Sequence, residues 1–350
     1  MQAKTRWLMA LVLLGAMAAS GCGDGGDKSK ADRTSAPAGP ATAAVKNMFG
    51  QATAEVASAQ NPLTPEKIAL GRMLFYDARL SASGTISCNS CHQLDNFGVD
   101  GKPTSEGHDG SLGTRNSPTV YNAAGQLAQF WDGREPDVEN QAKGPVLNSV
   151  EHGMDDAAAV EKVLKSIPGY GPLFAAAFPG QADPITFDNF ALAVGAFERK
   201  LTTYGRWDRW LVGDGTAITQ QEKAGLDVFI ETGCATCHMG TNMGGSLFQK
   251  MGAVEAYHTA DLGRFAVTQN EAEKSFFKVP GLRNIAQTGP YLHDGSVASL
   301  EQVTEIMARH QLGKTLTPQQ IADVTAFLKA LTGKIPAEYI AKPELPASAS

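Results

Sequence analysis

Four stretches of the chain repeat apolar residues at the spacing of an α-helix, and each stretch follows a threonine. A threonine side chain at a helix start accepts a hydrogen bond from a backbone N–H that has no partner inside the helix. In two of the four stretches a proline comes next, and proline fits the first helical turn. The pattern predicts helices that begin after Thr64, Thr186, Thr219 and Thr317.

Side-chain patterns inside these stretches strengthen the prediction. Glu222 stands three residues after Thr219, which is the spacing of a capping box. Two stretches place their apolar residues on one face: Phe190, Val194, Phe197 and Leu201 in the second, and Ile321, Val324, Leu328 and Leu331 in the fourth. We therefore expect a mainly α fold.

The N-terminus has the pattern of an exported protein. Lys4 and Arg6 precede the apolar run LMALVLLGAMAAS, which suits a signal peptide and is too short to span a bilayer comfortably. The small residues that end at Cys22 resemble a bacterial lipoprotein processing site, so we predict a signal peptide over 1–22 and a lipid anchor on Cys22. The alternative is ordinary cleavage nearby, and both readings predict a periplasmic protein.

Residues 23–60 are small, polar and rich in proline and glycine, which predicts a flexible tether. The chain of 350 residues has a formal net charge of −6 and no run of basic residues, so nucleic acid is not an expected partner.

Four of the five cysteines lie in two CxxCH motifs, Cys88-Asn-Ser-Cys91-His92 and Cys234-Ala-Thr-Cys237-His238. Structural zinc would require both pairs to meet at one metal, although each pair has its own histidine. A thioredoxin-like site has one such pair in a βαβ context, and no such context is visible. In an exported chain, each motif predicts a covalent c-type haem with the histidine as the proximal iron ligand.

A second similarity links the two halves of the chain. Pro118, Asn122 and Asp132-Gly133 each have a counterpart 162 residues later, at Pro280, Asn284 and Asp294-Gly295. We therefore predict two cytochrome c-like haem domains related by internal duplication. Their expected bounds are 61–215 and 216–335, and a loose tail would follow at 336–350.

The function of each haem depends on the sixth iron ligand. For the second haem, several methionines and histidines are candidates: Met243, Met251, His258, His293, Met307 and His310. For the first, His108 lies in a glycine-rich loop where a removable ligand or an ordinary solvated histidine would fit. Glu151 could move a proton beside an open iron, or it could be a surface carboxylate.

Taken together, these segments resemble the bacterial dihaem cytochrome c peroxidases, and the similarity spans roughly residues 61–335. The stretches that carry it are LSASGTISCNSCH, RNSPTVYNAAGQLAQFWDGR, ENQAKGPVLNSVEHGM, GCATCH, VPGLRNIAQTGPYLHDG and IMARHQLG. FWDGR and PYLHDG make the match specific, because two CxxCH motifs alone occur in many cytochromes.

The resemblance implies that the haem on His92 reacts with peroxide. His108 matches the histidine that closes this haem in the oxidised resting form of many members. Gln141 and Glu151 match the residues that orient and protonate peroxide.

The resemblance further implies that His238 and Met307 hold a high-potential haem that receives electrons. Trp131 matches a tryptophan that lies between the haems. One calcium ion is expected at the domain interface, at the positions matched by Asn116, Thr288 and Pro290.

The expected activity is reduction of hydrogen peroxide to water, with electrons from a small cytochrome c or similar periplasmic donor, by a protein that forms homodimers. One alternative is a dihaem electron carrier without catalysis. Another is a family member that matures a protein-derived cofactor, in which a tyrosine stands at the place of Met307.

Overall fold

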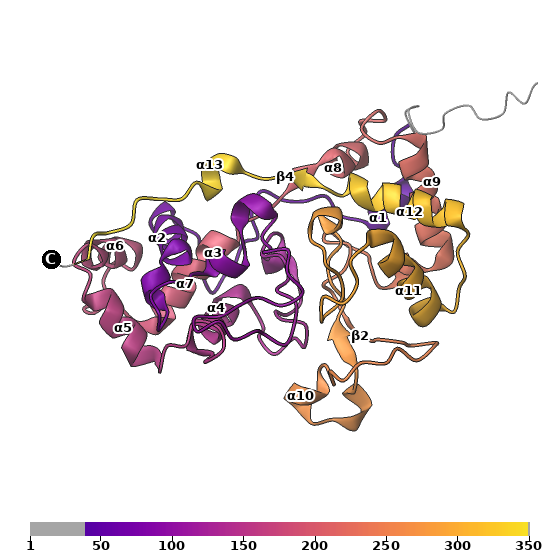
Figure 1. Cartoon of the computed structure of the whole chain (residues 1–350). Coiled ribbons are helices and arrows are strands. Elements are labelled where there is room, and N and C mark those ends of the chain that lie inside the picture. The colour runs from indigo at the N-terminus through magenta and orange to yellow at the C-terminus, as the bar shows by residue number, and fades with distance from the viewer. Residues whose placement is uncertain (1–38, 349–350) are drawn as a thin grey trace, which may run out of the picture.

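The computed structural model describes residues 39–348 and is mainly helical, as the sequence predicts (Figure 1). The predicted signal peptide, residues 1–22, and the predicted lipid anchor on Cys22 lie outside these residues. The described helices are α1 Ala43–Met48, α2 Pro65–Tyr76, α3 Cys88–Cys91, α4 Val138–Leu147, α5 Ala157–Lys165, α6 Tyr170–Ala177, α7 Phe187–Glu198, α8 Arg206–Leu211, α9 Gln220–Thr232, α10 Phe265–Thr268, α11 Leu300–Leu312, α12 Pro318–Ala330 and α13 Ala337–Ile340. None of them has both the length and the apolar character to cross a bilayer.

Strands are short in the described part of the chain. Strand β1 (Tyr204–Gly205) pairs antiparallel with β4 (Gly333–Lys334), and β2 (Phe248–Lys250) pairs antiparallel with β3 (Phe276–Lys278). The helices therefore build the two hydrophobic cores, and the strands join segments at their edges.

The four helices predicted from the sequence are confirmed as α2, α7, α9 and α12. Each preceding threonine accepts a hydrogen bond from the backbone N–H three residues later. Glu222 completes the predicted capping box, because its side chain accepts from the N–H of Thr219 at 2.7 Å.

The four helices form two pairs in space. Helix α2 packs against α7 in the first core, and α9 packs against α12 in the second. A glycine permits each close approach: a Cβ on Gly71 would overlap with the backbone of Ala193, and a Cβ on Gly225 would overlap with that of Asp323. Two helical bodies thus lie side by side (Figure 1).

The segment before the first domain is packed, which differs from the tether expected over 23–60. Helix α1 and Phe49 belong to the core of the second body, where Phe49 is 1% exposed and meets Trp207 edge to face. The chain then crosses to the first body, where the N–H of Val56 donates to the carbonyl of Arg199. The described part of the expected tether, residues 39–60, therefore connects both bodies.

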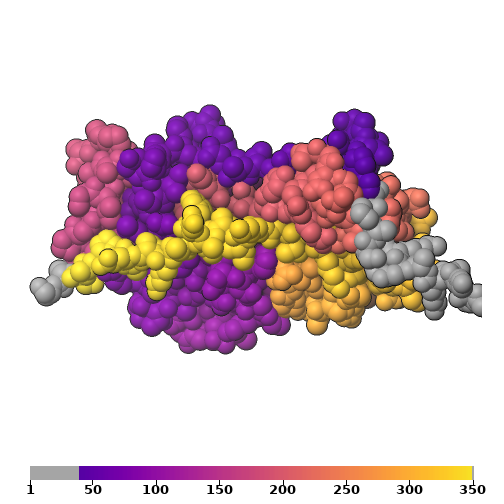
Figure 2. Space-filling model, turned by 90° about the horizontal axis from the view of Figure 1, so that it is seen from above, coloured from indigo at the N-terminus to yellow at the C-terminus, as the bar shows by residue number. Residues whose placement is uncertain are grey.

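The C-terminal segment also crosses between the bodies, although the sequence predicts a loose tail. Tyr339 stacks on Phe197 with ring centroids 5.1 Å apart, and its hydroxyl donates to the Phe197 carbonyl at 2.7 Å. Tyr76 donates to the carbonyl of buried Ile340 at 2.6 Å. In Figure 2 this segment, drawn in yellow, lies along the surface of the first body.

Candidate active site

The first CxxCH motif brings the two thiols and the imidazole that a c-type haem needs into one short segment. Cys88 and Cys91 both have free thiols and lie in the short helix α3. His92 follows, with its Nδ1 3.3 Å from the carbonyl oxygen of Gly98. That contact leaves Nε2 for a metal, and burial lowers the pKa of His92, which favours the neutral ring that binds metals.

The second motif repeats this arrangement. Cys234 and Cys237 are free, and Cys234 begins a 3-10 turn at Cys234–Thr236 directly after α9. His238 has its Nδ1 3.1 Å from the carbonyl oxygen of Met243, and burial lowers its pKa to about 4. Nε2 of this histidine is therefore also left for a metal.

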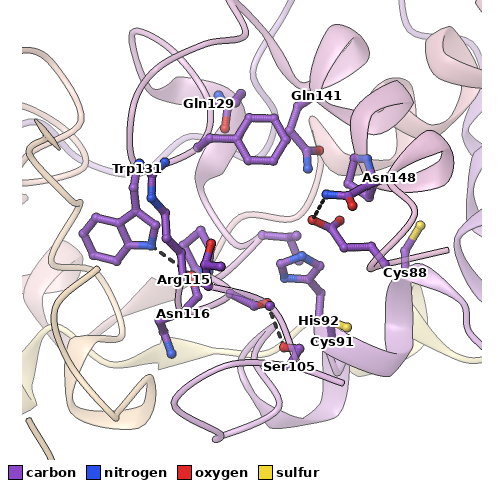
Figure 3. A pocket seen from close by; sticks show the side chains of 18 of the residues that line it. Cys88, Cys91, His92, Ser105, Arg115, Asn116, Gln129, Trp131, Gln141 and Asn148 are labelled. Carbon is purple, nitrogen blue, oxygen red and sulfur yellow. Dashed lines mark hydrogen bonds between the residues drawn. The ribbon is translucent and has the colours of Figure 1, made fainter. Parts of the chain in front are cut away.

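A cavity of about 730 Å³ lies beside the first motif (Figure 3). Its lining includes Cys88, Cys91 and His92, together with Gln141 and Glu151 from the segment of α4 and the turn after it. This volume falls within the range of cofactor pockets. Free thiols, a histidine with an available nitrogen and a cavity between them fit a covalently attached haem.

Part of the cavity wall is polar. Oε1 of Glu151 accepts a hydrogen bond from Nδ2 of Asn148 at 2.9 Å. Burial raises the pKa of Glu151, while Arg134 and Asn148 act in the other direction. A raised pKa favours the protonated carboxyl group, which is the form that can give a proton to a substrate.

His108 lies outside the cavity. Its Nε2 is 3.1 Å from the carbonyl oxygen of Ser149, and its backbone N–H donates to the carbonyl of Glu151 at 2.8 Å. The ring packs on Gly153, where an added Cβ would overlap with Nε2. This structure therefore docks the predicted removable ligand on the outer side of the turn that carries Glu151.

Trp131 lies on the cavity wall at the boundary between the two bodies. Its Nε1 donates to the carbonyl of Asn116 at 2.9 Å, and its ring meets that of His293 edge to face at 6.4 Å. The Trp131 carbonyl accepts from the N–H of Lys278 in β3 at 2.8 Å. The tryptophan thus contacts residues of both halves.

Charged side chains near this tryptophan connect the two bodies through ion pairs and a hydrogen bond. Arg115 contacts Asp132 at 2.6 Å and also Asp261 of the second half at 2.6 Å. Lys278 is 6% exposed and hydrogen-bonds to Gln126 of the first half. Burial lowers the pKa of Lys278 to about 8.

The remaining predicted ligands are placed as follows. Met307 is half-buried on α11. Asn116 receives a hydrogen bond on its carbonyl from Trp131, and its N–H donates to His293 at 2.8 Å. Thr288 and Pro290 lie a few residues before His293, so all three predicted calcium positions are near one loop. No cluster of three or more His, Cys, Asp or Glu side chains suited to a metal occurs in residues 39–348. A calcium site built on an amide and carbonyls stays a prediction.

Sequence reasoning missed His152, which also lines the cavity. It is 4% exposed and immediately follows Glu151. A single histidine carries no motif, and its placement depends on a contact with Leu80, 72 residues earlier.

Comparison with known proteins agrees with this geometry. Two haem-attachment motifs in a helical fold define a dihaem c-type protein. Residues 65–216 match the family described as di-haem cytochrome c peroxidase, and residues 222–332 match the cytochrome c family.

The chain is 45% identical to cytochrome c551 peroxidase of Pseudomonas aeruginosa, over 82% of this chain and 84% of that protein. It is also 45% identical to the protein of that name from Nitrosomonas europaea, over 81% and 88%. The chain therefore belongs to the di-haem cytochrome c peroxidase family.

More distant relatives share the architecture. The methylamine utilization protein MauG of Methylorubrum extorquens is 36% identical over 87% of this chain and 88% of its own length. A crystal structure of a MauG-like protein associated with microbial copper homeostasis superimposes with a TM-score of 0.74 at 29% identity, covering 85% of this chain and 98% of that chain.

Proposed function

We propose that this chain is a cytochrome c peroxidase that reduces hydrogen peroxide to water in the cavity beside His92, with electrons from a small cytochrome c or similar donor. Family membership supports the activity, since relatives 45% identical over most of their length are named cytochrome c551 peroxidases. One observation carries the proposal: a single cavity brings the first haem motif together with Gln141 and Glu151.

The proposed roles of the side chains follow from their chemistry. A c-type haem attached at Cys88 and Cys91 supplies an iron that binds peroxide and passes electrons. The amide of Gln141 orients the bound peroxide by hydrogen bonding. Glu151 donates a proton to the departing oxygen, and its burial and raised pKa support that role.

We assign His108 the role of a removable ligand. Its loop is anchored by the Ser149 and Glu151 carbonyls, which leaves the cavity open for peroxide. Release of these bonds would free the loop to bring the histidine back to the first iron. Movement of the His108 loop would then open or close the cavity to peroxide.

The second haem, on His238 with Met307 as the other ligand, would receive electrons from the donor. A methionine ligand raises the reduction potential of a haem, which suits an electron store. Trp131 is the proposed route between the haems, and its contacts with both halves support this.

Several contacts support the proposed duplication. The domain bounds 61–215 and 216–335 stay a prediction, and helix α8, which lies before residue 216, packs in the second core. Asn122 and Asn284 both adopt left-handed conformations, with φ of 60° and 63°. The side-chain amides of both donate to the hydroxyl of Thr203, at 3.1 and 3.0 Å. Isolated bridges pair Gln129 with Glu135 and Tyr291 with Val297, again 162 residues apart.

The remaining assignments rest on the sequence and the family resemblance. We propose a periplasmic protein, anchored through lipidated Cys22, that forms a homodimer. A calcium ion at Asn116, Thr288 and Pro290 would brace the interface near Trp131, because oxygen ligands suit calcium.

The test is peroxide-dependent oxidation of a reduced small cytochrome c, measured with fully oxidised protein and with protein given one electron. Activity only after that electron supports His108 as a removable ligand. Activity in both states would support the peroxidase activity and reject the role of His108 as a removable ligand. No activity in either state, with both haems spectrally intact, would favour the electron carrier or the maturation enzyme.

A Glu151→Gln variant tests the proton role. We expect kcat/KM for peroxide to fall by about 10²–10⁴, the usual contribution of a general acid. Glu66→Gln is the matched control, because Glu66 is an exposed carboxylate at the start of α2. Equal turnover in both variants would remove Glu151 from the mechanism.

A further inference from the structure

His152 offers a base to the cavity that the proposed mechanism does not use. The residue is 4% exposed, lines the cavity and directly follows Glu151. Its Nδ1 lies 2.9 Å from the carbonyl oxygen of Leu80. A nearly buried imidazole therefore lies on the same cavity wall as the proposed proton donor, Glu151.

The Leu80 contact fixes the tautomer of His152. A carbonyl oxygen only accepts hydrogen bonds, so Nδ1 must carry the proton and Nε2 must hold a lone pair. Burial lowers the pKa of His152, which keeps the ring neutral and the lone pair available. Nε2 has no hydrogen-bond partner among the described residues.

The surrounding backbone holds this ring in place. The N–H of His152 donates to the Pro145 carbonyl at 3.1 Å, and its carbonyl accepts from Ala82 at 2.8 Å. Leu80 is itself buried in the first core. The lone pair is therefore preorganised, which a catalytic group requires.

The neighbouring Glu151 is held by Asn148, so the acid and the base have separate anchors.

We propose that His152 is a second proton-transfer residue, which accepts through Nε2 the proton that hydrogen peroxide loses on binding. This deepens the proposed function and rests on it. In the step, one O–H bond of peroxide breaks and an N–H bond forms on His152. Glu151 then gives its proton to the departing oxygen, which leaves as water when the O–O bond breaks. The other oxygen leaves as a second water after it takes up the two electrons of the donor cytochrome, the proton held by His152 and one proton from solvent.

The consequence is a division of labour between adjacent residues. A single acid must first lose a proton before it can accept one from peroxide, whereas two separate side chains can each keep one of these tasks. The pair His152 and Glu151 therefore lets the cavity accept and donate protons at one pH.

Hydrogen cyanide tests this role without any turnover. It loses a proton when it binds haem iron, as peroxide does, whereas carbon monoxide binds reduced haem without proton transfer. In the holoprotein we expect His152→Leu and His152→Gln to slow hydrogen cyanide binding about tenfold or more. Carbon monoxide binding should change less than about twofold, since no base is needed.

Met154→Leu is the matched control, because Met154 is buried two residues further on in the first core. It should leave both rates unchanged. His152→Gln keeps a side chain that can donate to the Leu80 carbonyl, so it separates the missing base from a disturbed turn.

Unchanged hydrogen cyanide rates in both His152 variants would overturn the proposal. A low-spin first haem that becomes high-spin in electron paramagnetic resonance when His152 is replaced would also overturn it, because His152 would then be an iron ligand. If the His152 variants bind hydrogen cyanide slowly but the wild-type protein does not turn over peroxide, His152 would still be a base and the proposed function would be rejected.

Discussion

Replacement of Gly153 by alanine should shift the position of the His108 loop. Gly153 has φ of +73°, and an added Cβ would overlap with Nε2 of His108 in its docked position. To relieve the overlap, the ring must leave Ser149 and lose the hydrogen bond measured at 3.1 Å. The docked conformation, which leaves the cavity open, is therefore selectively weakened.

The Gly153→Ala substitution has two separate effects on the free energy of the docked conformation. Alanine at a positive φ costs about 1–2 kcal/mol whatever its neighbours. Loss of the His108 hydrogen bond adds about 1 kcal/mol, and lost packing increases this further. The second contribution alone corresponds to roughly a fivefold to thirtyfold shift toward the undocked loop.

Gly110→Ala is the matched control. Gly110 has φ of +85° in the same loop, but nothing lies within 4 Å of an added Cβ. It carries the backbone strain without the overlap on His108. The difference between the two variants isolates the docking of the histidine.

The assay is electron paramagnetic resonance of protein given one electron, which reports the high-spin fraction of the first haem. We expect this fraction to fall in Gly153→Ala and to stay near wild type in Gly110→Ala. Adding His108→Ala to Gly153→Ala should restore the high-spin signal. Identical spectra for the two glycine variants would refute the docking argument.

Two further predictions concern stability. Tyr339→Ala should lower the thermal midpoint of the first domain more than Tyr339→Phe, because only the alanine loses the ring stack on Phe197, which adds about 0.5–1.5 kcal/mol beyond area burial. Equal midpoints would mean that the C-terminal segment is not docked in solution. Asp77 is 1% exposed; burial opposes its charge, but hydrogen bonds from Arg79 and Tyr170 hold its pKa below the usual range. Its stabilising effect is present above the unfolded pKa of about 3.9 and is lost as pH falls through the lower folded value. Thermal unfolding between pH 7 and pH 3 should show that Asp77→Asn is about 2 kcal/mol less stable than wild type at neutral pH. This difference in the free energy of unfolding should shrink below about pH 4, and a difference that does not change with pH would contradict the prediction.

Local chemistry explains what the sequence predicts well. The threonine caps and the apolar spacing specify α2, α7, α9 and α12, because capping involves residues only three positions apart. The two CxxCH motifs are equally local, since the thiols and the proximal histidine of each haem lie within five residues.

The ends of the chain show where sequence reasoning fails. Composition predicts a tether over 23–60 and a loose tail over 336–350. In the described parts, Phe49 is buried in the second core and Tyr339 stacks on Phe197. One or two apolar residues are too few to show the regular spacing of a helix or strand. Their burial depends on a surface formed by a segment far away in the sequence.

The sequence by itself determined the mainly helical fold, the two haem motifs and the family, because each is expressed by residues close together in the chain. Only the tertiary structure decided that Gln141, Glu151 and His152 share one cavity with His92, and that His108 lies outside it. Those outcomes depend on packing and hydrogen bonds between distant segments, such as the bond from His152 to the carbonyl of Leu80. No local pattern records such contacts.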